Sequence, residues 1–237
     1  MNLKTAALGL ALAAAAPGTA SAAVTFTVGQ QAAANPTAGN FLNVWPSSGG
    51  ESPGNAIDDN LTNKYLNFAK NNTGYIFSPG AAAPVSASII GINFVSGNDA
   101  PLRDPTSFQL YGSNTASANT TAGTIYNVSS DFTLIASGAI SLPDQPDGNT
   151  RNNVRTTFNT SFAATGSYST FLLVFPTVKG STDPAVNSMQ IGEARLQTAS
   201  GPLTNLGVIA GGQLTIPEPA ATALLFLAGA IGLRRRR

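Results

Sequence analysis

The feature that most constrains the fold is a series of short apolar runs separated by turn-forming clusters. The runs have the length of strands, and they span residues 88–95, 107–111, 132–136, 171–175 and 189–196. The segments between them are rich in Gly, Asn, Pro and Asp, which favour turns. No stretch has a sustained helical period, and there is no internal repeat. The pattern predicts an all-β fold, one antiparallel β-sandwich over residues 23–200.

The spacing within the runs indicates which residues face the core. Ile90, Ile92 and Phe94 alternate with polar or small residues and share one face, as do Phe108 and Leu110. Residues 171–175 are apolar throughout, which is expected of a strand that is covered on both sides.

Composition excludes several classes of function. Only 10% of the 237 residues are charged, and Cys and His are absent. The chain therefore cannot carry a Ser-His-Asp triad, a Cys nucleophile, a His-ligated zinc site or a disulfide. Residues 23–216 carry seven basic and ten acidic residues, a net charge of −3, without a basic stripe. This charge argues against nucleic-acid binding.

Residues 1–22 have the organisation of a secretory signal peptide that forms a short apolar helix. Lys4 is the positive flank, residues 6–16 are an apolar run, and Ala20-Ser21-Ala22 is a small-residue cleavage site. We expect cleavage between Ala22 and Ala23 and export across the cytoplasmic membrane.

Residues 216–237 combine a short motif, an apolar run and a basic end. Pro217-Glu218-Pro219 precedes the apolar residues 220–233. The basic end consists of Arg234, Arg235, Arg236 and Arg237. A helix over residues 220–233 would be about 21 Å long, shorter than the ~30 Å hydrocarbon core, so we expect only transient membrane contact. The glycine-containing residues 201–215 read as a flexible linker to this tail.

The C-terminal segment resembles a PEP-CTERM sorting signal. The resemblance implies recognition by an exosortase, a membrane-embedded protease and transpeptidase. It also implies a place in the cell envelope or extracellular matrix of a Gram-negative bacterium that forms biofilm. The alternative is a plain C-terminal anchor.

A run of oxygen-bearing side chains occupies a predicted turn at residues 58–63. Calcium takes roughly six to eight oxygen ligands, including backbone carbonyls, so this run is a candidate calcium loop. An EF-hand is excluded, because Asn63 and Ala69 stand where its glycine and its bidentate Glu belong. The alternative is a solvated Asx-rich turn.

Glu193 has the strand parity of Met189 and Ile191, which places it on the predicted buried face. An inward carboxylate is costly unless it is paired, and either a calcium ion or Arg195 would pair it. The alternative is a bulge at Gly192 that turns Glu193 outward.

The body of the chain resembles a discoidin-type (factor V/VIII C-type) domain in three segments that follow the order of that family. They are residues 56–68, 98–114 and 188–196. They contain an early Ala-x-Asp loop, a central Ser-x-x-Leu-Tyr-Gly-Ser strand-turn and a final Gln-Ile-x-Glu strand. The resemblance implies a galactose-binding-like jelly roll with a structural calcium between the early loop and the final strand. It makes Asp58, Asn60 and Glu193 side-chain ligands. Asn63 stands where relatives carry a ligating Thr, and Asp59 replaces their usual Gly.

Such domains bind glycans through loops at one end of the sandwich. Trp45, the only Trp, lies in a turn-like setting and is a candidate for stacking on a sugar; the alternative is packing at the rim of the core. Arg103 and Asp104 form a second loop candidate, whose alternative role is an ion pair or turn cap.

The sequence predicts an exported, non-catalytic surface or matrix protein that binds carbohydrate, such as an exopolysaccharide. One alternative is a purely structural matrix or adhesion protein. Another is a glycan-processing enzyme, which needs two carboxylates about 5–10 Å apart. Nothing in the sequence brings such a pair across a cleft.

Overall fold

The computed structural model of this chain describes residues 23–29, 50–79, 87–144, 155–163, 166–203 and 206–216. The predicted signal peptide, Trp45 and the predicted sorting motif from Pro217 onward lie outside these residues. The elements in chain order are β1 (Thr25–Val28), the 3-10 helix η1 (Pro53–Ala56), β2 (Tyr65–Asn67), β3 (Thr73–Pro79), β4 (Gly91–Val95), the 3-10 helix η2 (Pro101–Arg103), β5 (Ser107–Ser113), β6 (Ile125–Asn127), α1 (Val128–Asp131), β7 (Thr133–Ala139), β8 (Thr157–Ser161), β9 (Thr170–Phe175), β10 (Met189–Ile191), β11 (Glu193–Thr198), β12 (Gly201–Pro202) and β13 (Leu206–Thr215).

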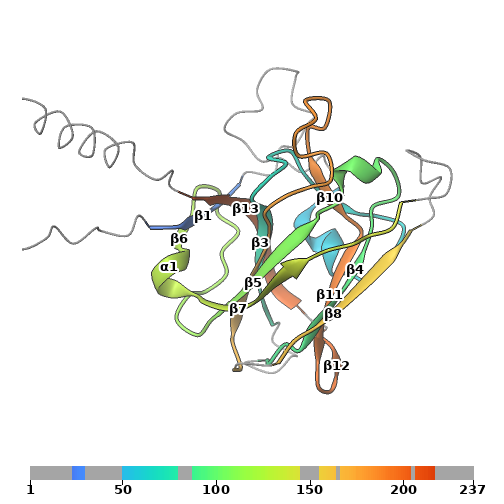
Figure 1. The fold of residues 1–237 in the computed structure, drawn as a ribbon. Coiled ribbons are helices and arrows are strands. Elements are labelled where there is room, and N and C mark those ends of the chain that lie inside the picture. The colour runs from blue at the N-terminus through green and yellow to red at the C-terminus, as the bar shows by residue number, and fades with distance from the viewer. Residues whose placement is uncertain are drawn as a thin grey trace, which may run out of the picture.

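The strands form two packed layers (Figure 1). One layer is a seven-stranded sheet in the order β6-β1-β13-β3-β9-β5-β7. The other contains a four-stranded sheet, β12-β11-β4-β8, and the pair β10-β2. All the strand pairs are antiparallel. The predicted all-β sandwich is therefore confirmed.

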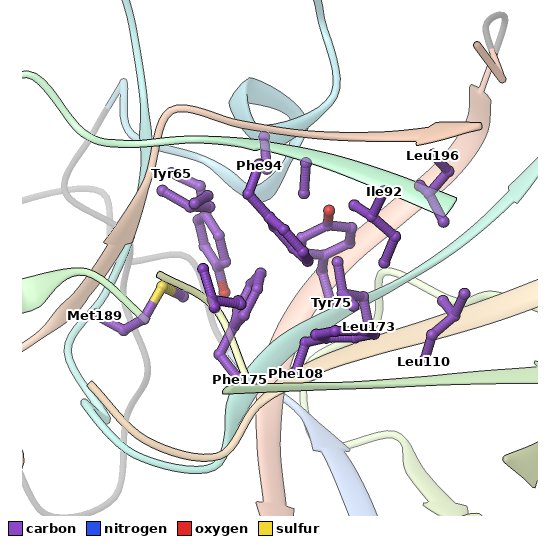
Figure 2. Packing of buried hydrophobic residues seen from close by; sticks show 14 of the residues in the cluster. Tyr65, Tyr75, Ile92, Phe94, Phe108, Leu110, Leu173, Phe175, Met189 and Leu196 are labelled. Atoms are coloured by element: carbon purple, nitrogen blue, oxygen red, sulfur yellow. The ribbon is translucent and has the colours of Figure 1, made fainter. Parts of the chain in front are cut away.

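The main core fills the space between the layers. Figure 2 shows Tyr75, Phe108, Leu110, Leu173 and Phe175 of the seven-stranded sheet facing side chains of the other layer. The facing residues are Tyr65, Ile92, Phe94, Met189 and Leu196. The rings of Phe94 and Phe108 meet across the layers with their centroids 5.4 Å apart. Burial of this aromatic and aliphatic surface is the main stabilising force of the sandwich.

A second, smaller core lies on the opposite face of the seven-stranded sheet. Strand β9 supplies residues to both cores in strict alternation. Phe171, Leu173 and Phe175 join the main core, whereas Leu172 and Val174 join the second. The second core is covered by residues around β6 and α1, including Tyr126, Val128 and Phe132. The predicted burial of residues 171–175 on both sides is therefore confirmed.

The expectation of a flexible linker at residues 201–215 is wrong. Residues 206–215 form β13, which pairs with both β1 and β3 in the seven-stranded sheet. A side chain at Gly212 would overlap the carbonyl oxygen of Thr27, and one at Gly211 would overlap the hydroxyl of Tyr65. These glycines therefore serve close packing rather than flexibility.

The first and last described residues lie at the same end of one strand pair. Thr25 of β1 is the register partner of Thr215 of β13, so Ala23 and Ile216 are neighbours at that end (Figure 1). Among the residues that the structure describes, no helix is long and apolar enough to span a membrane.

Candidate functional site

The Asx-rich loop at residues 58–63 is held together by hydrogen bonds of its own side chains. Asp58 Oδ1 accepts from the backbone N–H of Asn60 at 2.9 Å, and Asp58 Oδ2 accepts from Asn63 Nδ2 at 2.8 Å. Asn60 Oδ1 accepts from both the backbone N–H and the hydroxyl of Thr62, at 3.0 and 2.7 Å. Asp59 has a φ of 61°, in the left-handed region that usually selects glycine. The loop is therefore compact and held by local hydrogen bonds.

Glu193 points into the protein beneath this loop. The predicted single strand over residues 189–196 is interrupted at Gly192, where the chain passes from its partner β2 to its partner β4. A side chain at Gly192 would overlap the guanidinium of Arg155 and the carbonyl of Ser96. The interruption does not turn Glu193 outward, since its exposed fraction is 0%.

The Glu193 carboxylate is poorly compensated. Neither oxygen has a hydrogen-bond partner among the described residues. Burial, followed by the neighbouring carboxyl of Asp58, raises the pKa of Glu193 from 4.5 to about 7, while Arg195 and the backbone of Asp59 oppose the rise. Glu193 also affects Tyr75, because burial and then the charge of Glu193 raise the pKa of the Tyr75 phenol. The phenol oxygen is likewise buried without a hydrogen-bond partner. Burial and the neighbouring carboxyl therefore both disfavour the ionised form of Glu193.

The residues present fit a hard cation at this position. Asp58, Asn63 and Glu193 gather here, and Asn63 Oδ1 is a further buried oxygen without a partner. The described residues contain no group of three acidic, His or Cys side chains placed to hold a metal ion, so amide and carbonyl oxygens would have to complete the shell. Asn60 fits less well, because its side-chain oxygen already accepts two hydrogen bonds. Arg195 pairs with Asp59 at 2.5 Å, and within the described part of the chain no ion pair joins it to Glu193, although its charge still acts on that carboxyl.

A polar cavity of about 450 Å³ lies beside the loop. It is formed by three segments distant in the sequence, which contribute Glu51, Thr62, Asn63, Lys64, Asn98 and Asp99. Lys64 is the one basic side chain among its described lining residues and is only 6% exposed. Lys64 Nζ lies 2.6 Å from Asp99 Oδ1, 3.1 Å from Gln190 Oε1 and 3.5 Å from Glu51 Oε1.

Arg155 joins the cavity wall to the four-stranded sheet. Its Nη1 donates to the carbonyl of Ser96 at 2.8 Å, and its Nη2 donates to the carbonyl of Asn63 at 2.7 Å. Sequence reasoning missed Arg155, Lys64 and Gln190. The position of Lys64 next to the buried Tyr65 was the one available signal, since a lysine at the start of a buried strand needs partners.

Arg103 and Asp104 have different surroundings. Asp104 is fully buried, and its carboxylate lies 3.3 Å from Lys179 Nζ, which is the ion pair of the alternative interpretation. A ligand-binding role of the two residues stays a prediction. Arg103 lines a separate cavity of about 260 Å³, with Leu102 and Val186 among its neighbours. Trp45 lies outside the described residues, and its stacking role stays a prediction.

Comparison with known proteins gives matches among solved structures alone. No family model and no curated protein sequence matches the chain. One similar structure is CpGH89CBM32-5 from Clostridium perfringens in complex with GalNAc-beta-1,3-galactose: 13% identity, TM-score 0.41, covering 73% of this chain and 92% of that chain. The family 32 carbohydrate-binding module of C. perfringens NanJ in complex with galactose has 14% identity and a TM-score of 0.36, covering 63% and 87%. The C-terminal domain of a Bacteroides fragilis chitobiase has 10% identity and a TM-score of 0.31, covering 62% and 79%.

Proposed function

We propose that this chain is an exported, non-catalytic protein of the cell envelope or extracellular matrix that binds carbohydrate in the polar cavity. The observation that carries the proposal is the cavity itself, about 450 Å³ in volume and lined by hydroxyl, amide, carboxylate and ammonium groups. Its volume is in the range of small-molecule sites, about 300–1,000 Å³. Sugar hydroxyls both donate and accept hydrogen bonds, and this lining offers partners for both.

The cavity is held in shape before any ligand arrives. Lys64 is held by hydrogen bonds to Asp99 and Gln190 and by an ion pair with Glu51. Arg155 donates to the carbonyls of both Asn63 and Ser96. A pre-organised site loses less conformational entropy on binding, which favours recognition of a weakly binding ligand such as a saccharide.

The same contacts argue against hydrolysis. A glycosidase needs one carboxyl group that is protonated to act as an acid, beside a second that is ionised. Glu51 and Asp99 both contact the ammonium of Lys64, so both are ion-pair partners. The cavity therefore suits binding, and the alternative of a glycan-processing enzyme is not favoured by its geometry.

We also propose a structural calcium ion next to the cavity, with Asp58, Asn63 and Glu193 as side-chain ligands. Calcium would supply the positive charge that the buried, unpartnered oxygens of Glu193 lack. Asn60 belongs to the same loop, but its side-chain oxygen already accepts two hydrogen bonds from Thr62. Its contribution would be to hold the loop in shape.

The proposals for export and sorting rest on sequence. The signal peptide up to Ala22 and the tail from Pro217 to Arg237 would deliver the protein to the exosortase, with residues 220–233 in brief contact with the membrane. The purely structural matrix role remains the second candidate, since a disulfide-free sandwich with a large aromatic core needs no ligand to contribute bulk.

A saccharide-binding assay tests the proposed function. The purified protein is titrated with neutral, amino and acidic polysaccharides in calcium, and binding is followed by calorimetry and by the melting temperature. We expect at least one saccharide to bind, and we expect the Asp99→Ala variant to bind that saccharide more weakly. Asp144→Ala, which removes a carboxylate outside the cavity, is the matched control. A protein indifferent to every saccharide would favour the structural role instead.

A further inference from the structure

We propose that the polar cavity selects saccharides that carry a free amine over their N-acetylated and acidic counterparts. This inference depends on the proposed carbohydrate-binding function and specifies the chemical class of its ligand. It follows from how charge and hydrogen-bonding capacity are distributed over the lining residues.

The negative groups of the cavity face the solvent, whereas its positive group does not. The side chains of Glu51 and Asp99 are 29% and 55% exposed, but that of Lys64 is only 8% exposed. The lining therefore carries a net charge of −1, from two carboxylates and one ammonium. An entering ligand meets the carboxylates before it meets the lysine.

The donors of Lys64 are already engaged. The ammonium of Lys64 donates hydrogen bonds to Asp99 Oδ1 and Gln190 Oε1, and it makes an ion pair with Glu51 at 3.5 Å. The side-chain amide of Gln190 is engaged as well, because its Nε2 donates to the backbone carbonyls of Asp99 and Ala100. Lys64 is therefore an internal brace of the cavity and not an anion-binding group.

Acceptor capacity remains on the wall. A carboxylate has about four lone-pair sites, so the contacts with Lys64 leave sites on Asp99 for a ligand. Thr62, another lining residue, donates its hydroxyl proton to Asn60 Oδ1, so its oxygen is left as an acceptor. The lining as a whole therefore offers more acceptors than donors.

A protonated amine on a sugar ring matches this lining best. It supplies donors to the carboxylates, and charge-assisted hydrogen bonds are roughly twice as strong as neutral ones. N-acetylation removes the positive charge and adds an acceptor, whereas a uronate or sulfate group brings like charge to the carboxylates. The hydroxyl of Thr62 and the amides of Asn63 and Asn98 suit the remaining hydroxyls of a sugar.

The test compares matched oligosaccharides on the full chain. Chitosan tetrasaccharide, its N-acetylated twin chitin tetrasaccharide, an oligogalacturonate and a lysine tetrapeptide are titrated by calorimetry in calcium at low and high salt. We expect chitosan to bind at least about tenfold more tightly than chitin, and the oligogalacturonate not to bind. High salt should reduce the preference, because the selective contacts are electrostatic.

Variants locate the selectivity in the cavity. Glu51→Gln should reduce the preference for chitosan by about tenfold and leave chitin binding little changed. Asp99→Asn is the second variant, in case the first lowers the melting temperature. Asp144→Asn removes the same charge outside the cavity and should retain the full preference.

The outcomes separate the inference from the function on which it depends. Equal binding of chitosan and chitin, or a preference that survives both cavity variants, would overturn the inference and leave carbohydrate binding intact. Equal binding of the lysine tetrapeptide would also overturn it, because the amine would then be recognised without a sugar. Binding of none of the saccharides would overturn the proposed function itself.

Discussion

Replacement of Glu193 by Gln should have opposite effects on stability without and with calcium. Glutamine keeps the size of the side chain and removes its charge. In the absence of a cation, the wild-type carboxylate is buried, its oxygens lack hydrogen-bond partners, and Asp58 lies beside it. The variant should therefore be the more stable protein at alkaline pH in EDTA.

The magnitude follows from the pKa. Burial, with the Asp58 carboxyl beside it, raises the pKa of Glu193 from 4.5 to about 7. One pKa unit corresponds to about 1.4 kcal/mol, so the upper limit is about 3 kcal/mol. Asp58 is exposed and water screens its contribution, so we expect about 1–3 kcal/mol. That is roughly 2–12 °C in Tm for a chain of this size.

The direction of the pH dependence is fixed by the sign of the shift. A folded-state pKa above the unfolded value means that folding favours the protonated form of Glu193. The wild-type protein in EDTA is therefore most stable below pH 4.5 as far as this group is concerned, and it loses stability as the pH rises through about 7. Glu193→Gln should lack this slope.

Calcium should reverse the order of the two proteins. At a free concentration of about 1,000 Kd, ligation stabilises the wild type by about 4.1 kcal/mol, which exceeds its deficit of about 1–3 kcal/mol in EDTA, and the variant lacks one ligand. Thermal melts of both proteins at pH 5 and pH 8, in EDTA and in calcium, measure the effect of pH and the effect of calcium on each protein. A wild-type Tm that ignores pH in EDTA would refute the pKa argument. A variant that gains as much from calcium as the wild type would exclude Glu193 as a ligand.

Two further predictions concern the fold. A chain that ends at residue 200 lacks β13 and should show no cooperative melt by circular dichroism, whereas one that ends at Ile216 should melt like the full protein; a cooperative melt of the shorter chain would contradict the topology. Lys179→Met removes the ammonium from the buried Asp104 and should lower the free energy of unfolding by about 3–5 kcal/mol in urea denaturation. Asp144→Asn, which removes the exposed partner of Lys179, should cost less than about 1 kcal/mol.

The strands were predictable where local pattern and tertiary environment agree. Residues 107–111 alternate because one face of β5 lies on the main core, and residues 171–175 are all apolar because β9 lies between two cores. The pattern failed at residues 201–215, where glycine indicates either flexibility or close packing. Only the neighbours of Gly211 and Gly212 distinguish the two, and they come from the distant β1 and β2.

The candidate site was predictable in part for a similar reason. The inward position of Glu193 followed from strand parity, and the loop that carries Asp58 was visible as a dense Asx turn, because both are local properties. Their role as metal ligands stays a prediction. The cavity was not identified, because Glu51, Lys64 and Asp99 come from three loops that only the folded sandwich brings together. Asp104 is a charged residue in a predicted loop, which made it a candidate for ligand binding. Its burial against Lys179 depends on contacts far along the chain.

The position of β13 has a mechanical consequence. β13 is hydrogen-bonded on both edges, to β1 over residues 212–215 and to β3 over residues 206–213. Its C-terminal end leads directly to Ile216, so tension applied there runs along the strand. Ladder hydrogen bonds lie across this direction, so the load is shared in shear by two ladders rather than peeling one bond at a time. A protein held by this end would resist flow through an interior strand of its largest sheet and not through an edge strand.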